Sequence, residues 1–406
     1  MRPRLLGAAG AAFLAAAALA GRAAAQERVF VRPEPGTPVV AVQVLVGVGP
    51  VDEAPEQAGI SYLAARAVVE PARTVLDSLG AHLDVDQRRD AIAFTLTAAP
   101  DAWAAATRVL MLALFRDPVD SASVVRTRTA IARELAAREA SPADALEREV
   151  SKAVYGPDHP WGRPVVGTAT SVRAIRVSMV DGFLRRNFTP ERSVVAVVGP
   201  VEEAEARDEL APHMPAGELR TDTVPPPTPA DAPVEAEYNS ITTWVSATWR
   251  FGGDSDVEAL RMLAQLALDR VSFGPSRRSI YNSRAEVVQY AGGGEVRLTI
   301  VVPPREAEQW AAQLREAVGG YAAEPLAPAL FQERLRRFRG ERLLELDLPE
   351  QRAAAMARAA LLGDRTATLV DFTGLTPARL QAAARNLENP IIVFLGPAGS
   401  QGGGTH

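Results

Sequence analysis

The sequence predicts an α+β protein made of two homologous α/β sandwich domains, each a mostly antiparallel sheet with helices packed on one face. Runs of β-branched residues typical of buried strands alternate with longer amphipathic stretches typical of helices. Residues 186–200 and 385–397 both read as a helix end, a turn and a buried strand stopped by Gly-Pro. Gly199 and Gly396 lie 197 residues apart, which favours duplication of one domain over a chance match.

The residue patterns indicate the strands and helices in chain order. The expected strands are Val39–Val46, Ala91–Ala98, Val194–Val198, Thr242–Arg250, Val296–Val302 and Ile391–Leu395. The expected helices are Ile60–Val69, Arg73–Leu79, Asp101–Leu114, Ala122–Arg138, Ala143–Tyr155, Met179–Phe188, Val257–Leu268, Pro304–Ala322, Pro328–Leu346 and Pro349–Leu362. Pro304, Pro328 and Pro349 suit first helical positions, because no backbone donor is needed there.

Residues 1–25 are expected to be a secretory signal peptide. A basic start precedes an apolar run from Leu5 to Ala20, and a run of alanines then offers a cleavage site near Ala25. The apolar run is shorter than about 20 residues, so we favour a signal peptide over a membrane anchor. Cleavage removes three arginines and changes the net charge from −5 to −8. We therefore expect an exported protein, periplasmic or secreted, with no membrane span in its mature chain.

Proline usage divides the mature chain. Prolines are concentrated between residues 212 and 233, where apolar periodicity is weak, as is typical of a linker. The glycine-rich end is expected to be a disordered tail. The expected organisation is an N-terminal domain at 28–211, a linker at 212–233, a C-terminal domain at 234–399 and a tail at 400–406.

Composition excludes several kinds of site. The chain has no cysteine, so disulfides and thiolate metal sites are absent. It has four histidines, and no two are spaced as a pair on one helix turn. The acidic balance argues against nucleic-acid binding. Glycines 292–294 have no following Gly-Lys-Ser/Thr, so they predict a turn or bulge rather than a phosphate loop.

Several segments, in order, resemble the N-terminal domain of the insulinase/pitrilysin family of zinc metallopeptidases. They are Val46-Gly47-Val48-Gly49 with Asp52-Glu53 and Gly59; Leu79-Gly80-Ala81-His82-Leu83-Asp84; Tyr155-Gly156 with His159-Pro160-Trp161-Gly162-Arg163-Pro164; and Val194–Gly199. The resemblance covers nearly all of residues 30–200. It implies a helix with an inverted His-x-x-Glu-His motif, in which two histidines bind zinc and the glutamate activates water.

The helix that should carry this motif has lost it. Tyr62 stands where the first histidine belongs, Ala65 replaces the glutamate and Arg66 replaces the second histidine. A catalytic zinc site needs about three protein ligands and an open position. Tyrosine is a weak ligand at neutral pH, and arginine adds a positive charge where the cation should lie. Zinc, the family's cofactor, is therefore not expected here, and no residue is assigned as catalytic or metal-binding.

Three other residues fall at positions that the resemblance makes functional. Glu134 matches the family's distal zinc-binding glutamate, although we favour an ordinary ion pair with Arg66 or Arg138. Asp84 lies where the family has an edge-strand residue that receives substrate. Tyr290 matches a tyrosine that assists the transition state in active members. Asp84 and Tyr290 are thus weak candidates for substrate binding.

Family members with four such domains form a closing chamber around unfolded peptide, and some reach four by pairing a catalytic chain with a non-catalytic one. The resemblance, to the non-catalytic subunits of mitochondrial processing peptidase and to bacterial two-chain homologues, implies the non-catalytic role. The expected partners are a catalytic homologue and peptide substrates. Two alternatives stay open: a stand-alone peptide-binding or structural protein of the same fold, and a metallopeptidase with a relocated metal site.

Overall fold

The computed structural model describes residues 28–215, 217–272, 279–364, 366–367, 369–370 and 372–397. The predicted signal peptide, its cleavage site and the predicted tail lie outside these residues. No helix among the residues that the structure describes has the length and apolar character needed to cross a membrane.

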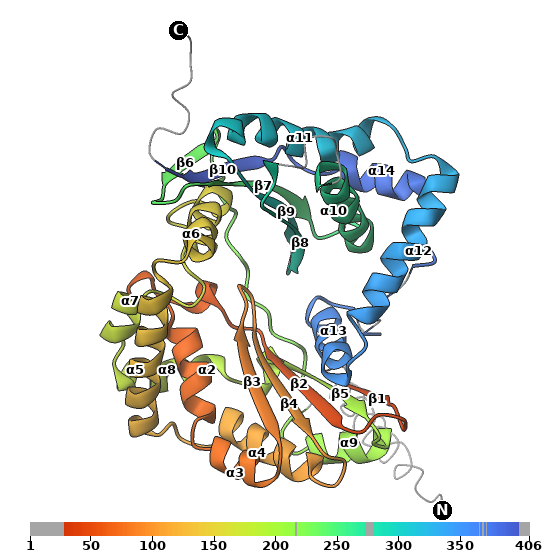
Figure 1. The fold of residues 1–406 in the computed structure, drawn as a ribbon. Helices are drawn as coiled ribbons and strands as arrows, with labels where there is room; N and C mark the ends of the chain where they lie inside the picture. Colours follow the sequence, from red (N-terminus) through yellow and green to blue (C-terminus); the bar gives the residue numbers. More distant parts are fainter. Residues whose placement is uncertain are drawn as a thin grey trace, which may run out of the picture. The chain divides into compact units, whose positions relative to one another are not determined.

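Two five-stranded sheets with the same strand order organise the described chain (Figure 1). Sheet A has the order β1-β5-β2-β4-β3, built from Val29–Pro33, Ser193–Gly199, Val40–Val46, Ile92–Ala98 and His82–Gln87. Sheet B has the order β6-β10-β7-β9-β8, built from Val234–Glu237, Ile391–Gly396, Thr243–Gly252, Gly293–Val302 and Asn282–Tyr290. In each sheet the first pair of strands is parallel and the others are antiparallel. The α+β prediction with two related sandwiches is confirmed, and the shared order supports duplication.

The inner strands of both sheets form because their side chains are buried on both faces. All residues of β2 and of β5 are buried, and both strands are rich in valine, which favours the extended conformation. The outer strands β3 and β8 alternate exposed with buried or half-buried positions instead. Among the described residues, β3 and β8 each pair with another strand on one side only, so both lie at a sheet edge.

Helices follow the strands in both halves. The first half contains α2 (Ile60–Val69), α3 (Arg73–Ser78), α4 (Trp103–Phe115), α5 (Ser121–Arg138), α6 (Pro142–Tyr155), α7 (Ala169–Ala174), α8 (Val177–Asn187) and α9 (Glu203–Leu210). The second contains α10 (Val257–Ser272), α11 (Ala307–Ala323), α12 (Pro328–Leu344), α13 (Pro349–Leu361) and α14 (Pro377–Arg385). Pro328 and Pro349 begin α12 and α13, and Pro304 begins the short 3-10 turn Pro304–Glu306 before α11.

Each sheet has its main helix layer on one face. In sheet A, α2 and α4 contact β4, and α3 contacts β3. In sheet B, the apolar side chains of β7 and β9 form one core with α10, α11 and α14. The largest fully buried side chain of this second core is Trp310 on α11.

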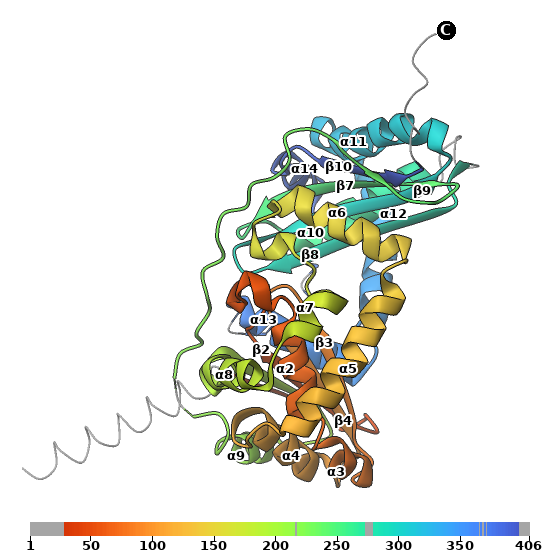
Figure 2. The same ribbon diagram turned by 90° about the vertical axis from the view of Figure 1, so that its left-hand side faces the viewer.

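Each sheet also carries one further helix on its other face, and this helix comes from the opposite half of the sequence. The helix α13 packs on β5, β2 and β4 of sheet A. The helix α6 packs on β10, β7 and β6 of sheet B. Figures 1 and 2 show α6 against one face of sheet B and α11 and α14 against the other.

The compact units therefore differ from contiguous halves. Of the described residues, the first unit contains those within 28–132, 170–223 and 346–369. The second contains the described residues within 133–169, 224–345 and 370–397. The predicted ranges 28–211 and 234–399 enclose the strands of the two sheets, but α6 and α13 are exchanged between them.

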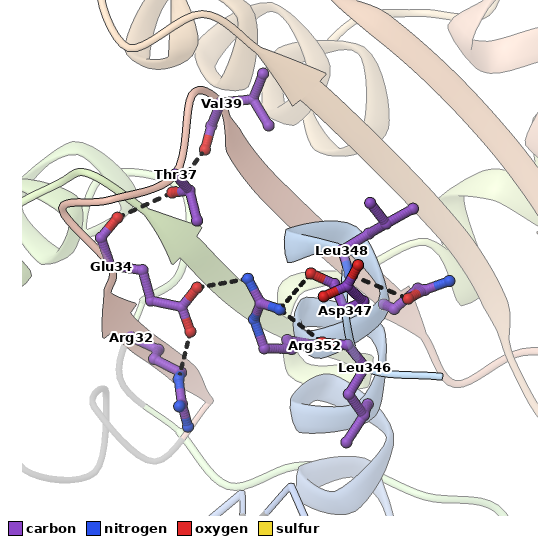
Figure 3. Close-up of polar contacts among 9 residues, drawn as sticks. Arg32, Glu34, Thr37, Val39, Leu346, Asp347, Leu348 and Arg352 are labelled. Carbon is purple, nitrogen blue, oxygen red and sulfur yellow. Dashed lines mark hydrogen bonds and ion pairs between the residues drawn. The ribbon is translucent and has the colours of Figure 1, made fainter. Parts of the chain in front are cut away.

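The exchanged helix α13 is tied to the end of β1 by Arg352 (Figure 3). The Arg352 guanidinium donates to Glu34 Oε2 at 2.6 Å and to the carbonyl oxygens of Leu346 and Asp347 at 2.6 and 2.7 Å. Glu34 also accepts a hydrogen bond from Arg32 Nε at 2.6 Å. These bonds fix the chain entering α13 to the edge of sheet A.

Candidate functional site

The helix α2, where the zinc motif is expected, begins at a buried carboxylate. Glu53 is 6% exposed and accepts hydrogen bonds from Gly59 N at 2.9 Å, Ser61 N at 3.1 Å and Ser61 Oγ at 2.5 Å. These bonds satisfy amide donors that a helix N-terminus leaves free, and the negative charge suits that end of the helix dipole. Gly59 has φ +91°, a left-handed conformation that glycine adopts without steric cost. The sequence thus still builds a well-anchored helix at this position.

Two of the three degenerate motif positions contact each other. Arg66 Nη1 lies 3.2 Å from Tyr62 Oη, in a hydrogen bond one helical turn apart. The Arg66 guanidinium carbon is 5.5 Å from the centre of the Tyr62 ring, within the range of a cation–π interaction. Ala65, which lies between them in the sequence, is fully buried, and its side chain has no polar atom.

This arrangement does not fit a zinc ion. Arginine has five N–H donors and no acceptor lone pair, so Arg66 cannot be a ligand. Its side chain also brings a permanent positive charge against the only oxygen on this face of the motif, the Tyr62 hydroxyl. Within the described residues, no group of three His, Asp or Glu side chains is arranged to hold a metal ion.

Two other candidate site residues, Glu134 and Asp84, lie outside α2. Glu134 is exposed on α5 and belongs to the other compact unit, so its pairing with Arg66 stays a prediction. The second predicted partner, Arg138, binds Asp144 at 2.7 Å. Asp84 lies on the edge strand β3, 72% exposed, and its Oδ2 is 3.0 Å from His82 Nε2. Asp84 thus lies on an edge strand of sheet A, and its role in substrate binding stays a prediction.

Tyr290, the candidate transition-state residue, lies at the end of β8 and is only 5% exposed. Its ring centre is 4.8 Å from that of Trp161. Trp161 lies in the loop at residues 159–164, one of the segments that resemble the insulinase family. His159 holds this loop: its Nδ1 accepts from Trp161 N at 3.0 Å, and its Nε2 lies 3.0 Å from the carbonyl oxygen of Pro225. These contacts define a neutral tautomer with the proton on Nε2. His159 thus has a structural role in this loop, and Tyr290 is part of a packed aromatic group.

A buried charged group in the same unit was missed by sequence reasoning. Arg297 on β9 binds Glu295 at 2.7 Å and also Glu147 on α6. Tyr155 Oη donates to Glu295 Oε2 at 2.9 Å. Burial alone would lower the pKa of Arg297, but Glu295 and Glu147 raise it above its ordinary value. The alternation of polar and apolar residues in Glu295–Ile300 is the signal that this face of the strand is polar.

A second charged group lies where the predicted linker leaves the first unit. Arg192 is 3% exposed and donates to Asp52 Oδ1 at 2.6 Å, to Asp222 and to the carbonyl oxygen of Gly47 at 2.7 Å. Burial and the hydrogen bond with Asp222 raise the pKa of Asp52 to about 6, against the opposing effect of Arg192. Residues of the linker are therefore docked on the unit, and Asp222 shares a buried arginine with Asp52.

Comparisons with known proteins agree with this fold. Residues 28–169 match the family described as insulinase, peptidase family M16. An uncharacterized zinc protease of Mycobacterium leprae is 29% identical over 186 residues, which cover 44% of this chain and 42% of that relative. The matched region thus spans less than half the length of this curated relative.

Solved structures extend the likeness to nearly the whole described chain. An M16 peptidase inactive domain from Pseudomonas fluorescens has a TM-score of 0.79 at 16% identity, covering 91% of this chain and 95% of that one. A chain of complex III2 from Candida albicans has a TM-score of 0.73 at 12% identity, covering 91% and 93%. Residues 28–169 are thus similar to the insulinase (peptidase M16) family, and the described chain has the two-sandwich fold of solved structures described as M16 peptidases.

Proposed function

We propose that this protein is a non-catalytic peptidase-like subunit that pairs with a zinc-binding homologue and helps to hold peptide. The contact between Arg66 and Tyr62 carries this proposal. It fills the face of α2 where two metal ligands belong with a cation and its hydrogen-bond partner. A fold that keeps the helix but not the zinc ligands can still bind a partner chain and peptide, although it lacks the groups for hydrolysis.

The chemistry lost from this helix is larger than one residue could restore. A metallopeptidase needs zinc to polarise the carbonyl and to lower the pKa of a bound water. It also needs a general base, whose loss alone costs roughly 10²–10⁴ in rate. Ala65 supplies no base, and Arg66 repels the metal. Any contribution to proteolysis therefore comes through a partner.

The descriptions of two relatives bear on this proposal. The Mycobacterium leprae relative is named a zinc protease, whereas the Pseudomonas fluorescens chain is described as an inactive domain. Export after cleavage near Ala25 is part of the same proposal, because residues 1–25 have the pattern of a signal peptide. Mass spectrometry and N-terminal sequencing of the protein isolated from the cells that produce it test this part. We expect a chain that begins near Gln26.

Co-expression with an M16 homologue bearing an intact His-x-x-Glu-His motif tests the pairing. We expect a stable complex that cleaves unfolded peptide faster than the homologue alone. If the homologue cleaves equally well without this chain, the proposal fails. Stoichiometric zinc in the purified chain would also overturn it.

A triple variant sharpens this test. Tyr62→His, Ala65→Glu and Arg66→His together rebuild the motif on α2. We expect the variant to bind more zinc than the wild type, measured by metal analysis after dialysis. The double variant Tyr62→His with Arg66→His separates metal binding from the missing base. Equal zinc content in the wild type and the triple variant would contradict the claim that these positions decide metal binding.

A structural or peptide-binding role without a catalytic partner is the second candidate. It is favoured by the fold shared, at 12% identity, with a chain of complex III2. Tight binding of unfolded peptide by the purified chain alone, with no stimulation of any homologue, would support this alternative.

A further inference from the structure

A cavity of about 250 Å³ lies in the second unit, between α10, the edge strand β8 and α12. None of the residues that line it lies on α2. Its floor is apolar and comes from all three elements: Leu268 on α10, Val287 on β8 and Phe338 on α12. A dry cavity of about 150 Å³ can hold a benzene-sized molecule, so this one holds a somewhat larger group.

The rim of the cavity carries charges of both signs, and its carboxylates already have partners. Glu345 pairs with Arg342, and Glu341 pairs with Arg337 at 2.8 Å. Glu286 pairs with Arg284 at 2.6 Å. These carboxylates are compensated and do not call for a cationic ligand.

Arg261 is different from the other arginine on the rim. Arg342 binds Glu258 with two nitrogens, at 3.2 and 3.1 Å, whereas Arg261 Nε is 3.5 Å from the same carboxylate. Among the described residues, Arg261 Nε is buried with no hydrogen-bond partner. Burial, and then the charge of Arg342, lower the pKa of Arg261. A cavity-lining guanidinium thus keeps one buried N–H donor without an acceptor among the described residues, although Glu258 and Glu345 partly oppose the lowering of its pKa.

We propose that this cavity binds the C-terminal residue of a peptide, with the carboxylate on Arg261 and an apolar side chain on the floor. A chain end supplies both features together: a carboxylate and, one carbon away, a side chain of suitable size. Arginine matches a carboxylate with paired N–H donors. An internal acidic side chain would reach Arg261 but leave the apolar floor uncovered. The assignment rests on the proposed peptide-holding function and names the end of the peptide that is held.

Direct titration of the full chain with small probes tests the site. The probe is N-acetyl-leucine, and the readout is the NMR shift of the methyl groups of Leu268 and Val287. We expect saturable shifts at these methyls. N-acetyl-leucinamide, which lacks the charge, is expected to bind about 10-fold or more weakly, in line with a lost charged hydrogen bond. Equal binding of acid and amide would overturn the proposal.

Variants assign the binding to the cavity. Arg261→Gln is expected to weaken N-acetyl-leucine binding about 10-fold or more. Ala285→Leu, which fills the cavity and leaves Arg261 in place, is expected to abolish the methyl shifts. Arg336→Gln, an exposed arginine on α12 outside the cavity, is the matched control and should bind as the wild type does. Unchanged binding in Arg261→Gln, with its thermal unfolding intact, would refute the assignment.

Two further probes distinguish the sources of a carboxylate. 4-Methylpentanoate carries the same apolar group without a peptide bond, and the α-amide of N-acetyl-glutamate carries only a side-chain carboxylate. Both are expected to bind more weakly than N-acetyl-leucine, and tighter binding of either would refute a chain-end site. The outcome is separable from the pairing test. If the chain stimulates peptide cleavage by a homologue but does not bind N-acetyl-leucine, only the cavity assignment is refuted. If it binds N-acetyl-leucine but does not stimulate a homologue, only the proposed pairing is refuted.

Discussion

The exchanged helices α13 and α6 each cover the second face of a sheet, and we call this covering the closure of the sheet. The two closures use different kinds of contact. The contact of α13 with sheet A is apolar: Ala353, Met356 and Ala357 are among the helix residues that pack on the alanine, valine and leucine side chains of β2, β4 and β5. The contact of α6 with sheet B contains charges, because Arg297 and Glu295 of β9 bind Glu147 and Tyr155 of α6. One architecture therefore tolerates two kinds of closure.

The difference has a physical consequence. Apolar closure gains free energy from buried area and tolerates exchanges that conserve volume. Polar closure gains little net free energy, because desolvation opposes the attraction between charges, but loss of one member leaves an uncompensated buried charge. We therefore expect sheet B to be the more sensitive to single polar substitutions and sheet A to changes of side-chain volume.

The substitution Arg297→Met should have the largest effect. It leaves Glu295, whose side chain is 3% exposed, without its arginine, and removal of one member of a buried pair costs about 3–5 kcal/mol. Hydrogen exchange measured by mass spectrometry should show the loss mainly in peptides from β7 and β9. Protection of β2 and β4 should change less.

Two variants check the cause of that loss. Arg305→Met removes an arginine that is 85% exposed and should change stability by less than about 0.5 kcal/mol. Arg297→Met combined with Glu295→Gln removes the stranded charge and should recover part of the loss. A cost below about 1 kcal/mol for Arg297→Met alone would mean that water reaches the group and that the two closures are alike.

How far the sequence predicts this fold follows from burial. The six strands expected from residue patterns are the inner strands β2, β4, β5, β7, β9 and β10. The strands β1, β3, β6 and β8, which those patterns did not identify, are the sheet edges. Edge strands bury fewer side chains, so their sequences carry a weaker periodic signal. Helix α2 was predicted with its observed bounds, because its apolar residues repeat at helical spacing.

The exchange of α6 and α13 was not predictable from local patterns. Each helix has an ordinary apolar stripe, and nothing in such a stripe says which sheet it covers. The site behaves in the same way. The loss of the zinc motif at Tyr62, Ala65 and Arg66 is visible in the sequence, but the hydrogen bond between Arg66 and Tyr62 and the cavity at Arg261 depend on three-dimensional placement.

A change of volume tests the apolar closure next. Ala357→Leu inserts three carbons where α13 meets sheet A at a fully buried position, and such overpacking costs about 1–3 kcal/mol. Exchange in β2 and β5 should accelerate. Ala355→Leu, a half-buried position on the same helix, is the control and should cost less. Equal costs at both positions would show that the close approach of α13 is not what holds it.

The dependence on pH should be smaller and confined to the first unit. Because the folded pKa of Asp52 is raised to about 6, its contribution to stability is present below about pH 4 and is lost as pH rises through about 6. Burial alone would raise the pKa of Asp222, but Asp52 and Arg192 lower it, so its titration acts in the opposite sense. We expect a net loss of about 1–2 kcal/mol between pH 4 and 7, carried by Asp52, because the lowered pKa of Asp222 places its own titration below this range.

The variant Asp52→Asn identifies the group responsible. It keeps the shape and removes the titration, so the free energy of unfolding should become flatter across that range. Arg297 itself should not titrate there, because its pKa is raised above its ordinary value. A loss of protection in sheet B strands that parallels that in sheet A would contradict this separation of the two units.

The smallest effect is expected from Arg358→Lys, which tests whether the apolar closure also needs its polar border. Arg358 on α13 binds both oxygens of Asp90, at 2.8 and 2.7 Å, and the two side chains are 15% and 9% exposed. Lysine keeps the charge but cannot reproduce the paired geometry, so we expect a loss of about 1 kcal/mol in urea unfolding. Arg32→Lys changes an arginine that is 49% exposed and should cost less than about 0.5 kcal/mol. A loss at Arg358 as large as that at Ala357 would mean that α13, like α6, depends on charge, and the contrast between the two closures would then be one of degree.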